Sequence, residues 1–593
     1  MRRPGAAFGL VIPTVCSLYA LQIKAVEAEF QKDARMNQHV PPKRRDRGPK
    51  GRLLDDVALV EIRGLLEGRD LRRDLLIEFL HLVQDTYGCL SAAHIRALSE
   101  LMGLPQAEIY EVASFYDHFD VVREGDAVPA PLTIRVCESI SCMMAGSEAV
   151  ISALQEGVDS SLIRVVRAPC MGRCDTAPAA RVCNREVDHA SADSVLKLAA
   201  EGGFDTIIPD YVNLYAYQEY GGYALYSKVR DGEITTEALL DALSDAGLRG
   251  LGGAGFPAGK KWGFVRSYPG PRLMTINGDE GEPGTFKDRF LLESDPHRTL
   301  EGALIAAHAV AAERIYFYMR DEYPAVLEIL RMEINALEEA GLIEPGYIEL
   351  RRGAGAYICG EESAMIESIE GKRGLPRHRP PYIAEVGLFG RPTLNHNVET
   401  LWWIRDIVEK GARWFADQGK PGHPGPRSWS VSGRVKEPGV KLAPAGITIR
   451  ELIDDYCGGM ADGHTFKAYL PGGASGGILP AAMDDIPLDF GGKLAELGAF
   501  VGSHAVVVLS DQDSVKDATI NLLQFFKHES CGQCTPCRGG TEKMVALLEQ
   551  EGPLDEAAIR DLEAVMRDAS ICGLGQAAPN PVNHLLIHFR EDL

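Results

Sequence analysis

Apolar residues recur with helical period in the first part of the chain, from Leu54 to about Asp120. The clearest run occupies positions i, i+3, i+4 and i+7 and consists of Leu76, Phe79, Leu80 and Val83. This spacing places four side chains on one face of an α-helix. Gly88 follows and is a suitable residue to end that helix. The segment therefore predicts a small helical bundle.

The pattern changes to short strands after residue 130. Residues 132–136 read as a strand that ends at Cys137, and residues 161–167 as a strand that ends just before Cys170. Residues 180–187 read as a third strand. Strands that stop at cysteines, with helical sequence between them, predict a small α/β domain of thioredoxin type.

The remainder of the chain divides by composition. Residues 205–230 form a Tyr-rich connector whose rings we expect to pack between domains, although redox or stacking roles stay open. A large α/β segment runs from Thr236 to about Phe415, and Pro- and Gly-rich sequence near 420–427 separates it from a β-rich stretch. That stretch carries turn signals at 436–439 and 471–473, and the last 80 residues look helical.

Length and charge restrict the function classes. A chain of 593 residues is long for one core, so three to five domains are expected. The net charge of −22 makes nucleic acid an unsuitable partner, because phosphate backbones bind clustered Lys and Arg. No run of 18 apolar residues supports a membrane span. The basic first 50 residues resemble a signal peptide weakly, and a disordered tail or an over-extended start is favoured.

The strongest chemical signal is a C-x2-C-x2-C run followed by a distant fourth cysteine. It consists of Cys531, Cys534, Cys537 and Cys572. Three closely spaced thiolates and one remote thiolate suit the corners of a [4Fe–4S] cluster. A four-cysteine zinc site is the alternative, but zinc sites usually use two separated pairs. A reducing compartment such as the cytoplasm fits the 13 cysteines better than a disulfide scaffold does.

A second group of cysteines forms two pairs separated by 27 residues. It consists of Cys137, Cys142, Cys170 and Cys174. Two pairs on neighbouring loops can hold a [2Fe–2S] cluster, one pair to each iron. Zinc is a more serious alternative here, because paired cysteines suit it too. The cysteines without a partner at ligand spacing are expected to be buried structural thiols, and they are Cys16, Cys89, Cys183, Cys359 and Cys457.

Three glycine-rich loops lie in the large α/β segment. The first, GLGGAG at 250–255, follows a predicted helix over 236–246 instead of a strand, so it is no dinucleotide fingerprint but a ligand loop, with Lys260 and Lys261 beside it. The second, NGDEGEPGTFKD at 277–288, follows an apolar strand, and its carboxylates can accept hydrogen bonds from ribose hydroxyls or a flavin ring. The third, GAGAYICGEES at 353–363, repeats that chemistry ahead of a helix.

Together these loops and the SCGQCTPCR…CGLG run resemble the NADH-oxidising flavoprotein subunit of respiratory complex I and its relatives. The upstream part resembles the 24-kDa-type partner subunit of that enzyme, fused to it here. The resemblance covers about residues 55–593 and implies a multidomain α/β and α+β protein. The implied parts are a tail (1–52), a helical bundle (53–125), a thioredoxin-like [2Fe–2S] domain (130–205), a linker (206–234), an FMN- and NAD-binding α/β domain (235–425), a β-grasp, soluble-ligand-binding domain (426–512) and a C-terminal helical bundle with the [4Fe–4S] cluster (513–593).

The resemblance also implies cofactor sites, and no separate acid–base residue is expected because FMN mediates hydride transfer. For FMN the implied residues are Gly250, Gly252, Gly253, Ala254, Gly255, Lys260, Asn277, Asp279, Glu280, Gly360, Glu361 and Asn397. For NAD(H), the substrate, they are Phe256, Lys260, Glu282, Tyr357, Glu362 and Tyr382. Two positions near the implied flavin contacts depart from the family pattern: Leu251 stands where Arg is usual, and His396 precedes Asn397 where an Asn pair is usual.

The whole-chain character looks most like the β subunit of soluble NAD-dependent formate dehydrogenases. That resemblance implies a catalytic α subunit with a molybdenum or tungsten pterin centre and further iron–sulfur clusters. Electrons would pass reversibly through the clusters to FMN and then as hydride to NAD+. The alternatives are the flavin subunit of an NAD-reducing hydrogenase, which typically lacks the upstream cluster cysteines, and a fused complex I module. A non-enzymatic scaffold with zinc at both cysteine groups is a third.

Overall fold

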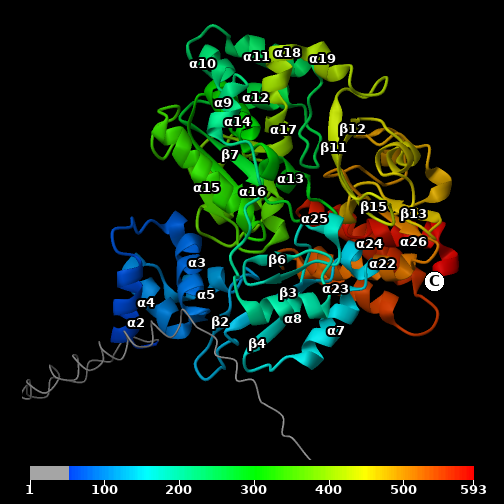
Figure 1. The fold of residues 1–593 in the computed structure, drawn as a ribbon, viewed down its shortest axis with the longest axis horizontal. Helices are drawn as coiled ribbons and strands as arrows, with labels where there is room; N and C mark the ends of the chain where they lie inside the picture. The colour runs from blue at the N-terminus through cyan, green and yellow to red at the C-terminus, as the bar shows by residue number, and fades with distance from the viewer. Residues whose placement is uncertain (1–51) are drawn as a thin grey trace, which may run out of the picture. The chain divides into compact units, whose positions relative to one another are not determined.

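The computed structural model describes residues 52–593, and residues 54–593 cluster as one unit. The tail expected over residues 1–52, except for Arg52, and Cys16 lie outside the described residues. Within the described part no helix is long and apolar enough to cross a membrane. Figure 1 shows the elements in chain order from blue to red.

The predicted bundle consists of four helices and a short parallel strand pair. The elements are α2 (Asp56–Leu65), α3 (Leu76–Tyr87), β1 (Leu90–Ser91), α4 (Ala92–Met102), α5 (Gln106–Ala113) and β2 (Val121–Val122). The helix predicted from the apolar stripe is confirmed as α3, and Gly88 ends it in the left-handed conformation at φ 75°. The stripe faces inward, because Leu76, Phe79, Leu80 and Val83 are all buried.

The thioredoxin-like domain has a four-stranded sheet of order β4-β3-β5-β6. Its elements are β3 (Leu132–Cys137), α6 (Ile140–Met144), α7 (Ser147–Gly157), β4 (Ile163–Ala168), β5 (Ala180–Val182), β6 (Arg185–Val187) and α8 (Ala192–Glu201). The first two predicted strands are confirmed within two residues. The prediction of a single third strand was wrong, because residues 180–187 form two short antiparallel strands joined as a hairpin. Its turn includes Cys183 at φ 53°, a conformation that strand periodicity does not indicate.

The large α/β domain is built on a parallel sheet of order β10-β7-β8-β9. The strands are β7 (Arg272–Gly278), β8 (Ala312–Met319), β9 (Ile348–Arg352) and β10 (Thr393–Asn397). The helices are α11 (Thr236–Asp245), α12 (Ala258–Ser267), α13 (Lys287–Ser294), α14 (Pro296–Val310), α15 (Pro324–Glu339), α16 (Glu362–Ile369), α17 (Val398–Trp402), α18 (Ile404–Lys410) and α19 (Ala412–Ala416). The carboxyl ends of β7 and β10 carry Asn277 and Asn397, paired in register, which places the second ligand loop and Asn397 at one sheet edge.

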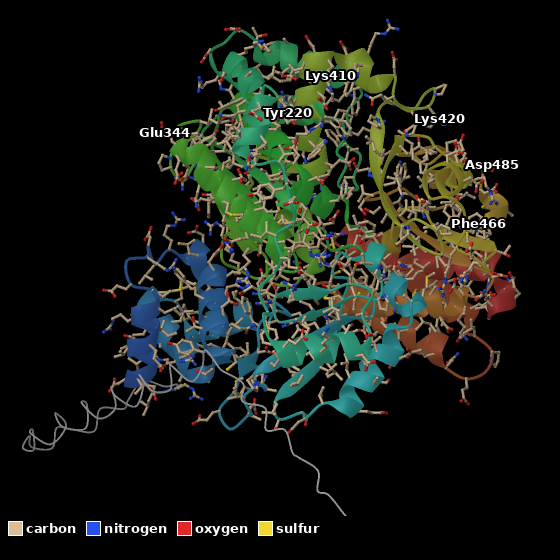
Figure 2. All side chains as sticks on the ribbon, in the orientation of Figure 1. Tyr220, Glu344, Lys410, Lys420, Phe466 and Asp485 are labelled. Carbon is tan, nitrogen blue, oxygen red and sulfur yellow. The ribbon has the colours of Figure 1, made fainter. Side chains whose placement is uncertain are left out.

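The Tyr-rich segment forms α9 (Leu214–Glu219) and α10 (Ala224–Arg230). Tyr217 and Tyr223 are buried in the core of the α/β domain, where their hydroxyls bond Glu301 and His297, each at 2.7 Å. Tyr220, labelled in Figure 2, is 76% exposed. The segment expected to link two domains thus packs onto one of them.

The β-rich stretch forms a five-stranded sheet of order β12-β11-β15-β13-β14. Its elements are β11 (Pro426–Gly433), β12 (Gly439–Pro444), α20 (Ile449–Glu451), β13 (Phe466–Leu470), β14 (Leu479–Pro480), α21 (Gly492–Glu496) and β15 (Ala505–Ser510). The turn signal at 436–439 lies in the connection of the β11–β12 hairpin. The helical C-terminal prediction is confirmed by α22 (Val515–His528), α23 (Thr535–Glu549), α24 (Glu556–Ala569), α25 (Gly573–Ala577) and α26 (Asn580–His588).

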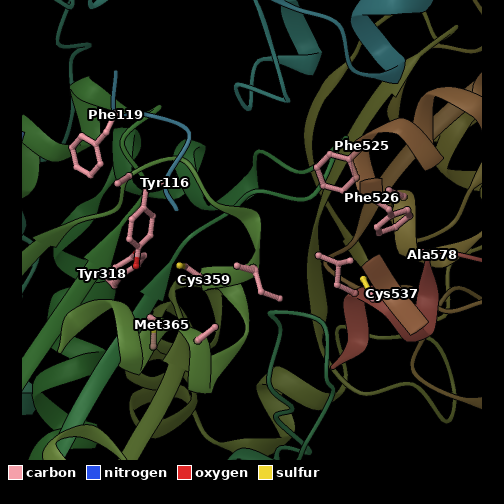
Figure 3. Packing of buried hydrophobic residues seen from close by; sticks show 14 of the residues in the cluster. Tyr116, Phe119, Tyr318, Cys359, Met365, Phe525, Phe526, Cys537 and Ala578 are labelled. Carbon is pink, nitrogen blue, oxygen red and sulfur yellow. The ribbon is translucent and has the colours of Figure 1, made fainter. Parts of the chain in front are cut away.

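One hydrophobic cluster runs through several of these parts (Figure 3). Tyr116 and Phe119 come from the bundle, Tyr318 and Met365 from the α/β domain, and Phe525 and Phe526 from the C-terminal helices, all buried. A continuous apolar contact of this kind holds domains in a fixed relation, because separating them would expose the shared surface to water. The parts that carry the cysteines and the ligand loops therefore share one hydrophobic core.

Candidate functional site

The four C-terminal cysteines line one small pocket. Cys534 directly precedes α23 and Cys537 lies in its first turn, while Cys572 directly precedes α25. All four are free thiols. Their neighbour Gly575 packs so closely that a side chain there would meet the Cβ of Cys537 at 2.8 Å. The fold thus brings the three-plus-one group together as the spacing predicts.

The chemistry of this pocket suits a metal cluster. Burial raises the pKa of the Cys537 thiol to about 11 and that of the Cys572 thiol to about 12. Free thiolates would be unfavourable there, whereas iron bound to the sulfurs favours the deprotonated form. The Ser530 hydroxyl lies 3.3 Å from the sulfur of Cys537, within hydrogen-bond reach. A four-thiolate group with this spacing fits a [4Fe–4S] cluster.

The four upstream cysteines converge in the thioredoxin-like domain, and all are at least 95% buried. The thiol of Cys137, at the end of β3, contacts those of Cys142 and Cys170, and Cys170 lies 3.4 Å from Cys174, sulfur to sulfur. Hydrogen bonds from Cys137 and Cys174 hold the pKa of the Cys170 thiol well below its usual range, and the nearby Arg320 guanidinium also favours its thiolate. This compact group of four buried thiols fits a [2Fe–2S] cluster.

The loop that carries Cys170 and Cys174 is fastened to the α/β domain. Arg320 donates to the carbonyl of Cys170 at 2.8 Å and also to the carbonyl of Glu280. Arg289 donates to the carbonyl of Gly172 at 2.9 Å. Gly172 has φ +65° and lies against Tyr323, where a side chain would overlap the ring. Only glycine satisfies both constraints, so this contact fixes the upstream cysteines against the second ligand loop.

A cavity beside the ligand loops has a volume of about 320 Å³. It is lined by residues from the α/β, β-grasp and C-terminal domains. The predicted residues in its wall are Gly252, Gly253, Ala254, Asn277, Asp279, Glu280, Gly360, Glu361 and Asn397, and, from the NAD(H) set, Glu282 and Tyr357. The size is within the usual range for a small-molecule site. The fold therefore gathers most of the implied flavin residues around one space.

Six predicted residues do not line this cavity. Gly250 and Phe256 close the first loop through a 2.8 Å backbone hydrogen bond, and Gly255 packs on Phe490. Lys260 is exposed on α12, while its neighbour Lys261 pairs with Glu362 at 3.3 Å. Tyr382 is 58% exposed. These residues are left outside the cavity wall.

The two carboxylates after β7 differ in their partners. Asp279 Oδ2 is buried and accepts no hydrogen bond from the described residues, and burial raises the pKa of this carboxyl well above its usual value. Glu280 instead accepts backbone N–H bonds from Asp288 and Arg289 at the start of α13, and a third bond from the Tyr323 hydroxyl. Asp279 Oδ2 thus lacks a donor, and a bound ring N–H would stabilise the buried carboxylate, a positive indication that a flavin fits. The carboxylate of Glu280 is thus already hydrogen-bonded to the start of α13.

Glycines make room for a flat ligand beside these carboxylates. A side chain at Gly252 would meet Asn397 at 2.8 Å, and one at Gly281 would meet Tyr357 at 3.0 Å. Gly253 has φ +122°, which residues with a side chain rarely adopt. The loop backbone can therefore approach a ligand closely, as the glycine content predicts.

Several wall residues were missed by the sequence reasoning. Lys287 and Asp288 are the last two residues of the loop at 277–288, and this position was the sequence feature that could have identified them. Lys287 is a buried ammonium in the wall, and Asp288 at 2.7 Å and Glu399 at 3.1 Å neutralise its charge. The β-grasp and C-terminal domains add Gly472, Ser475, Phe500, Gly502, Ser503, Gly573, Leu574 and Ala577. Gly472 lies in the turn signal at 471–473, and Gly573 and Leu574 lie in the CGLG run, but no local pattern indicates that these segments meet at one cavity.

Tyr357 ties the wall to two other domains. Its hydroxyl donates to Glu282, which also accepts the backbone N–H of Ser475 in the β-grasp domain at 2.7 Å. Its backbone N–H donates to Glu529 of the C-terminal domain at 2.9 Å. The third ligand loop is therefore anchored to both domains that complete the cavity.

The 320 Å³ cavity and the C-terminal cysteine pocket share part of their walls. Ile358 and Leu574 line both the 320 Å³ cavity and the C-terminal cysteine pocket. A group in the cavity and a cluster on the four cysteines would be separated by those apolar side chains. This arrangement suits passage of single electrons between the two sites.

Comparisons with known proteins agree with this arrangement. Residues 243–406 match the Nuo51 FMN-binding domain, residues 62–201 the thioredoxin-like [2Fe–2S] ferredoxin, and residues 517–593 the NADH-ubiquinone oxidoreductase-F iron-sulfur binding region. An NADH-quinone oxidoreductase subunit of Rhizobium meliloti is 40% identical over 402 residues, which are 65% of this chain and 94% of that protein. The chain belongs to the family of fused NADH dehydrogenase flavoprotein subunits.

Two further relatives extend the comparison. The mitochondrial NADH dehydrogenase [ubiquinone] flavoprotein 1 of Dictyostelium discoideum is 40% identical over 409 residues, covering 65% of this chain and 85% of that protein. A chain in the crystal structure of NAD+-reducing [NiFe]-hydrogenase in the H2-reduced state superposes with a TM-score of 0.77 at 33% identity, covering 88% of this chain and 92% of that one. This flavoprotein subunit is thus an NAD(H) oxidoreductase with an FMN-binding domain, a thioredoxin-like [2Fe–2S] domain and a [4Fe–4S] binding region.

The two sequence departures in this flavoprotein subunit lie behind the cavity wall. Leu251 is fully buried, and its backbone N–H donates to Thr400 Oγ1 at 2.8 Å. His396 is 3% exposed, and its ring accepts a 2.7 Å hydrogen bond from the indole of Trp262. Neither residue lines the cavity. The adjacent Asn397 does line it, so one member of the usual Asn pair keeps its place in the wall.

Proposed function

We propose that the chain is the diaphorase subunit of an NAD-dependent formate dehydrogenase. In this account it receives electrons from a partner subunit with a molybdenum or tungsten pterin centre and further iron–sulfur clusters, and it reduces NAD+ reversibly. The observation that carries the electron-transfer part is the wall of Ile358 and Leu574 shared by the cavity and the four C-terminal cysteines. The formate part rests on the whole-chain resemblance.

FMN is proposed to occupy the cavity and would convert single electrons from clusters into hydride for NAD+. Asp279 Oδ2 supplies an unpaired acceptor, and Gly252, Gly253 and Ala254 admit the ligand to the backbone. Glu361 caps α16 through the N–H groups of Ser363 and Ala364 and so positions the third loop.

NAD(H) is proposed to bind at the outer side of the flavin. Two aromatic side chains of the proposed set, Phe256 and Tyr382, are exposed by 42% and 58% and are available for stacking. Glu362 is held by Lys261 at 3.3 Å and by Arg379 at 3.1 Å, which keeps a carboxylate in place near the ligand loops. A carboxylate there would disfavour the 2′-phosphate of NADP through like-charge repulsion.

Two partner subunits are compatible with this proposal. The four buried upstream cysteines support a formate dehydrogenase, because flavin subunits of NAD-reducing hydrogenases typically lack them. The 92% coverage of a chain from an NAD+-reducing [NiFe]-hydrogenase favours a hydrogenase partner as the second candidate. In either case we propose a cytoplasmic location, where eight cluster-forming thiols would stay reduced.

The test is purification of the chain with its native partners, followed by anaerobic assay of NAD+ reduction with formate, with H2 and with neither. Formate-driven NADH formation is the expected result. NADH formation driven by H2 alone would replace the formate proposal with the hydrogenase one. If NADH reduces a dye but neither formate nor H2 drives NAD+ reduction, the result supports only the flavin module and neither proposed partner.

A further inference from the structure

A second cavity lies where the helical bundle, the thioredoxin-like domain and the α/β domain meet. Its volume is about 40 Å³, and its wall contains no cysteine and shares no residue with the wall of the flavin cavity. The basic residues in its wall are His118, Arg135, Arg167 and Arg181. The acidic residues are Asp117, Asp321 and Glu322.

Two of the arginines face one another across a strand pair. Arg135 on β3 and Arg181 on β5 are direct partners in the antiparallel register, so their side chains share one face of the sheet. Like charges in that position are destabilising unless something compensates them. Burial lowers the pKa of Arg135, and the Arg181 guanidinium lowers it further. The sheet thus presents a poorly compensated pair of cations to the cavity.

The acidic wall residues are largely engaged by other groups. Asp321 pairs with Arg352 at 2.6 Å and with His118 at 2.8 Å, and approaches Arg181 only to 3.8 Å. Glu322 pairs with Arg320 at 3.1 Å. The side chain of Asp117 is 61% exposed, so its charge is screened by solvent.

Arg135 itself has no carboxylate within ion-pair distance anywhere in residues 52–593, and Arg167, at the cavity edge, pairs with Glu148 at 2.6 Å.

Buried donor atoms in the cavity wall also lack hydrogen-bond acceptors. Arg181 is 4% exposed, and its Nε has no hydrogen-bond partner in the described chain. The Nε2 of His118 is likewise buried and unpartnered among these residues, while its Nδ1 contacts Asp321. Buried polar groups without partners are rare in folded proteins and often indicate a missing ligand.

We propose that this cavity binds one small oxyanion of the phosphate class, held by Arg135, Arg181 and His118. The volume accommodates about three water molecules, which is comparable with one tetrahedral oxyanion. A guanidinium can donate two parallel hydrogen bonds to such an anion, and the charge would compensate the arginine pair. The bound group could be inorganic phosphate or the terminal phosphate of a nucleotide.

A cation is the competing occupant, because ligand atoms of His81, His118 and Asp321 lie within 4.8 Å of one another. The surrounding charge opposes it. Asp321 already contacts the guanidinium of Arg352, and that of Arg181 lies 3.8 Å away. A divalent ion would be placed against two fixed positive charges, whereas an anion is attracted by both.

The site lies beside the upstream cysteine loop. Pro169 and Met171, the two neighbours of Cys170, line the cavity. A bound oxyanion therefore adds negative charge close to the proposed [2Fe–2S] ligands and would make reduction of that cluster less favourable. Anion concentration would then act on the upstream cluster without competing for NAD(H).

The experiment is equilibrium dialysis of the FMN-saturated holoenzyme with ³²P-labelled inorganic phosphate at constant ionic strength. We expect saturable binding of one phosphate per chain. Arg135→Gln and Arg181→Gln should each weaken it by about tenfold or more, the effect of one lost charge-assisted hydrogen-bond pair. Arg185→Gln is the matched control, because Arg185 lies on the same hairpin and does not line the cavity.

The outcomes separate the alternatives. An intact visible circular dichroism spectrum of the [2Fe–2S] cluster shows that each variant is folded, and Arg135→Gln alone decides if Arg181→Gln does not fold. Competition by AMP as strong as by phosphate supports a nucleotide source, and weaker competition supports free phosphate. Absence of saturable binding, equal binding by the variants, or one zinc per chain that is lost in His81→Ala would overturn the proposal.

Discussion

The backbone N–H of Tyr357 donates a 2.9 Å hydrogen bond to the carboxylate of Glu529. Tyr357 lines the flavin cavity, and Glu529 stands two residues before Cys531 in the sequence. The ring of Tyr357 also packs on Phe525, with 5.0 Å between ring centroids. The cavity wall and the start of the cysteine run are therefore held together by both a polar and an apolar contact.

Breaking this link should loosen flavin binding. Glu529→Ala leaves the Tyr357 N–H without its acceptor, at a cost of about 1–3 kcal/mol. If that cost falls on the loop that lines the cavity, FMN affinity should drop by about tenfold. Glu529→Gln keeps a carbonyl acceptor and should retain affinity near the wild-type value. The fluorescence of the flavin released during dialysis measures FMN affinity in both variants. Equal release from the two would contradict the role of Glu529 in holding Tyr357.

Cys572→Ser should remove the [4Fe–4S] cluster while leaving the flavin in place. Cys572 is one of four thiols in the pocket, whereas the flavin contacts proposed above lie on the other side of Ile358 and Leu574. We expect loss of the cluster's EPR signal, retained reduction of ferricyanide by NADH, and no electron delivery from the partner subunit. Cys457→Ser is the control, because Cys457 is buried in the β-grasp core. Full electron delivery in the Cys572 variant would refute the assignment.

Glu362→Gln should increase the use of NADPH relative to NADH. The carboxylate is held by Lys261 and Arg379, so its loss removes a negative charge and frees two cations that can attract a 2′-phosphate. Steady-state kinetics should show the gain mainly as a lower KM for NADPH. Glu367→Gln, on the same helix and paired with Arg377, serves as the control. Unchanged NADPH kinetics in the Glu362 variant would remove that residue from the proposed NAD(H) site.

Acid sensitivity should depend in part on His504. Both ring nitrogens are buried without partners among residues 52–593, and burial, with Arg427 and Lys287, lowers its pKa well below the usual value. Folding lowers the pKa of this histidine, so the folded state holds it neutral while the unfolded state takes up a proton below about pH 6.5. The free energy of unfolding therefore falls by about 1.4 kcal/mol per pH unit below that value. His504→Asn tolerates the backbone φ of 62° and should reduce this loss between about pH 6.5 and 5.

Urea unfolding followed by tryptophan fluorescence across that pH range provides the measurement. Trp429 packs against His504 with 5.2 Å between ring centroids, so its emission reports on this part of the core. The exposed His308, replaced by Gln, should leave the pH dependence as in the wild type. An identical pH slope in the Asn variant and the wild type would show that His504 does not titrate on unfolding.

Local patterns predicted the elements whose signal is contained in a few residues. The stripe around Leu80 predicted α3, and cysteine spacing singled out the eight thiols that the fold brings into two groups. The hairpin at Cys183 was missed because a left-handed residue inside a strand-like run leaves no periodic trace. The role of Glu280 in capping α13 could not be seen, because it depends on how the loop returns over the helix. Ser475 and Ala577 reach the cavity only through long-range packing.

The central claim is that electrons pass between NAD(H), a flavin in the 320 Å³ cavity and clusters on the eight cysteines. Anaerobic titration of the purified chain with NADH, followed by visible absorbance and EPR, tests it most directly. The account predicts six irons and one FMN per chain, bleaching of the flavin, and EPR signals of a reduced [4Fe–4S] cluster, joined by those of a [2Fe–2S] cluster where its potential allows. A colourless chain that contains zinc, or a flavin that bleaches while no cluster becomes reduced, would contradict it.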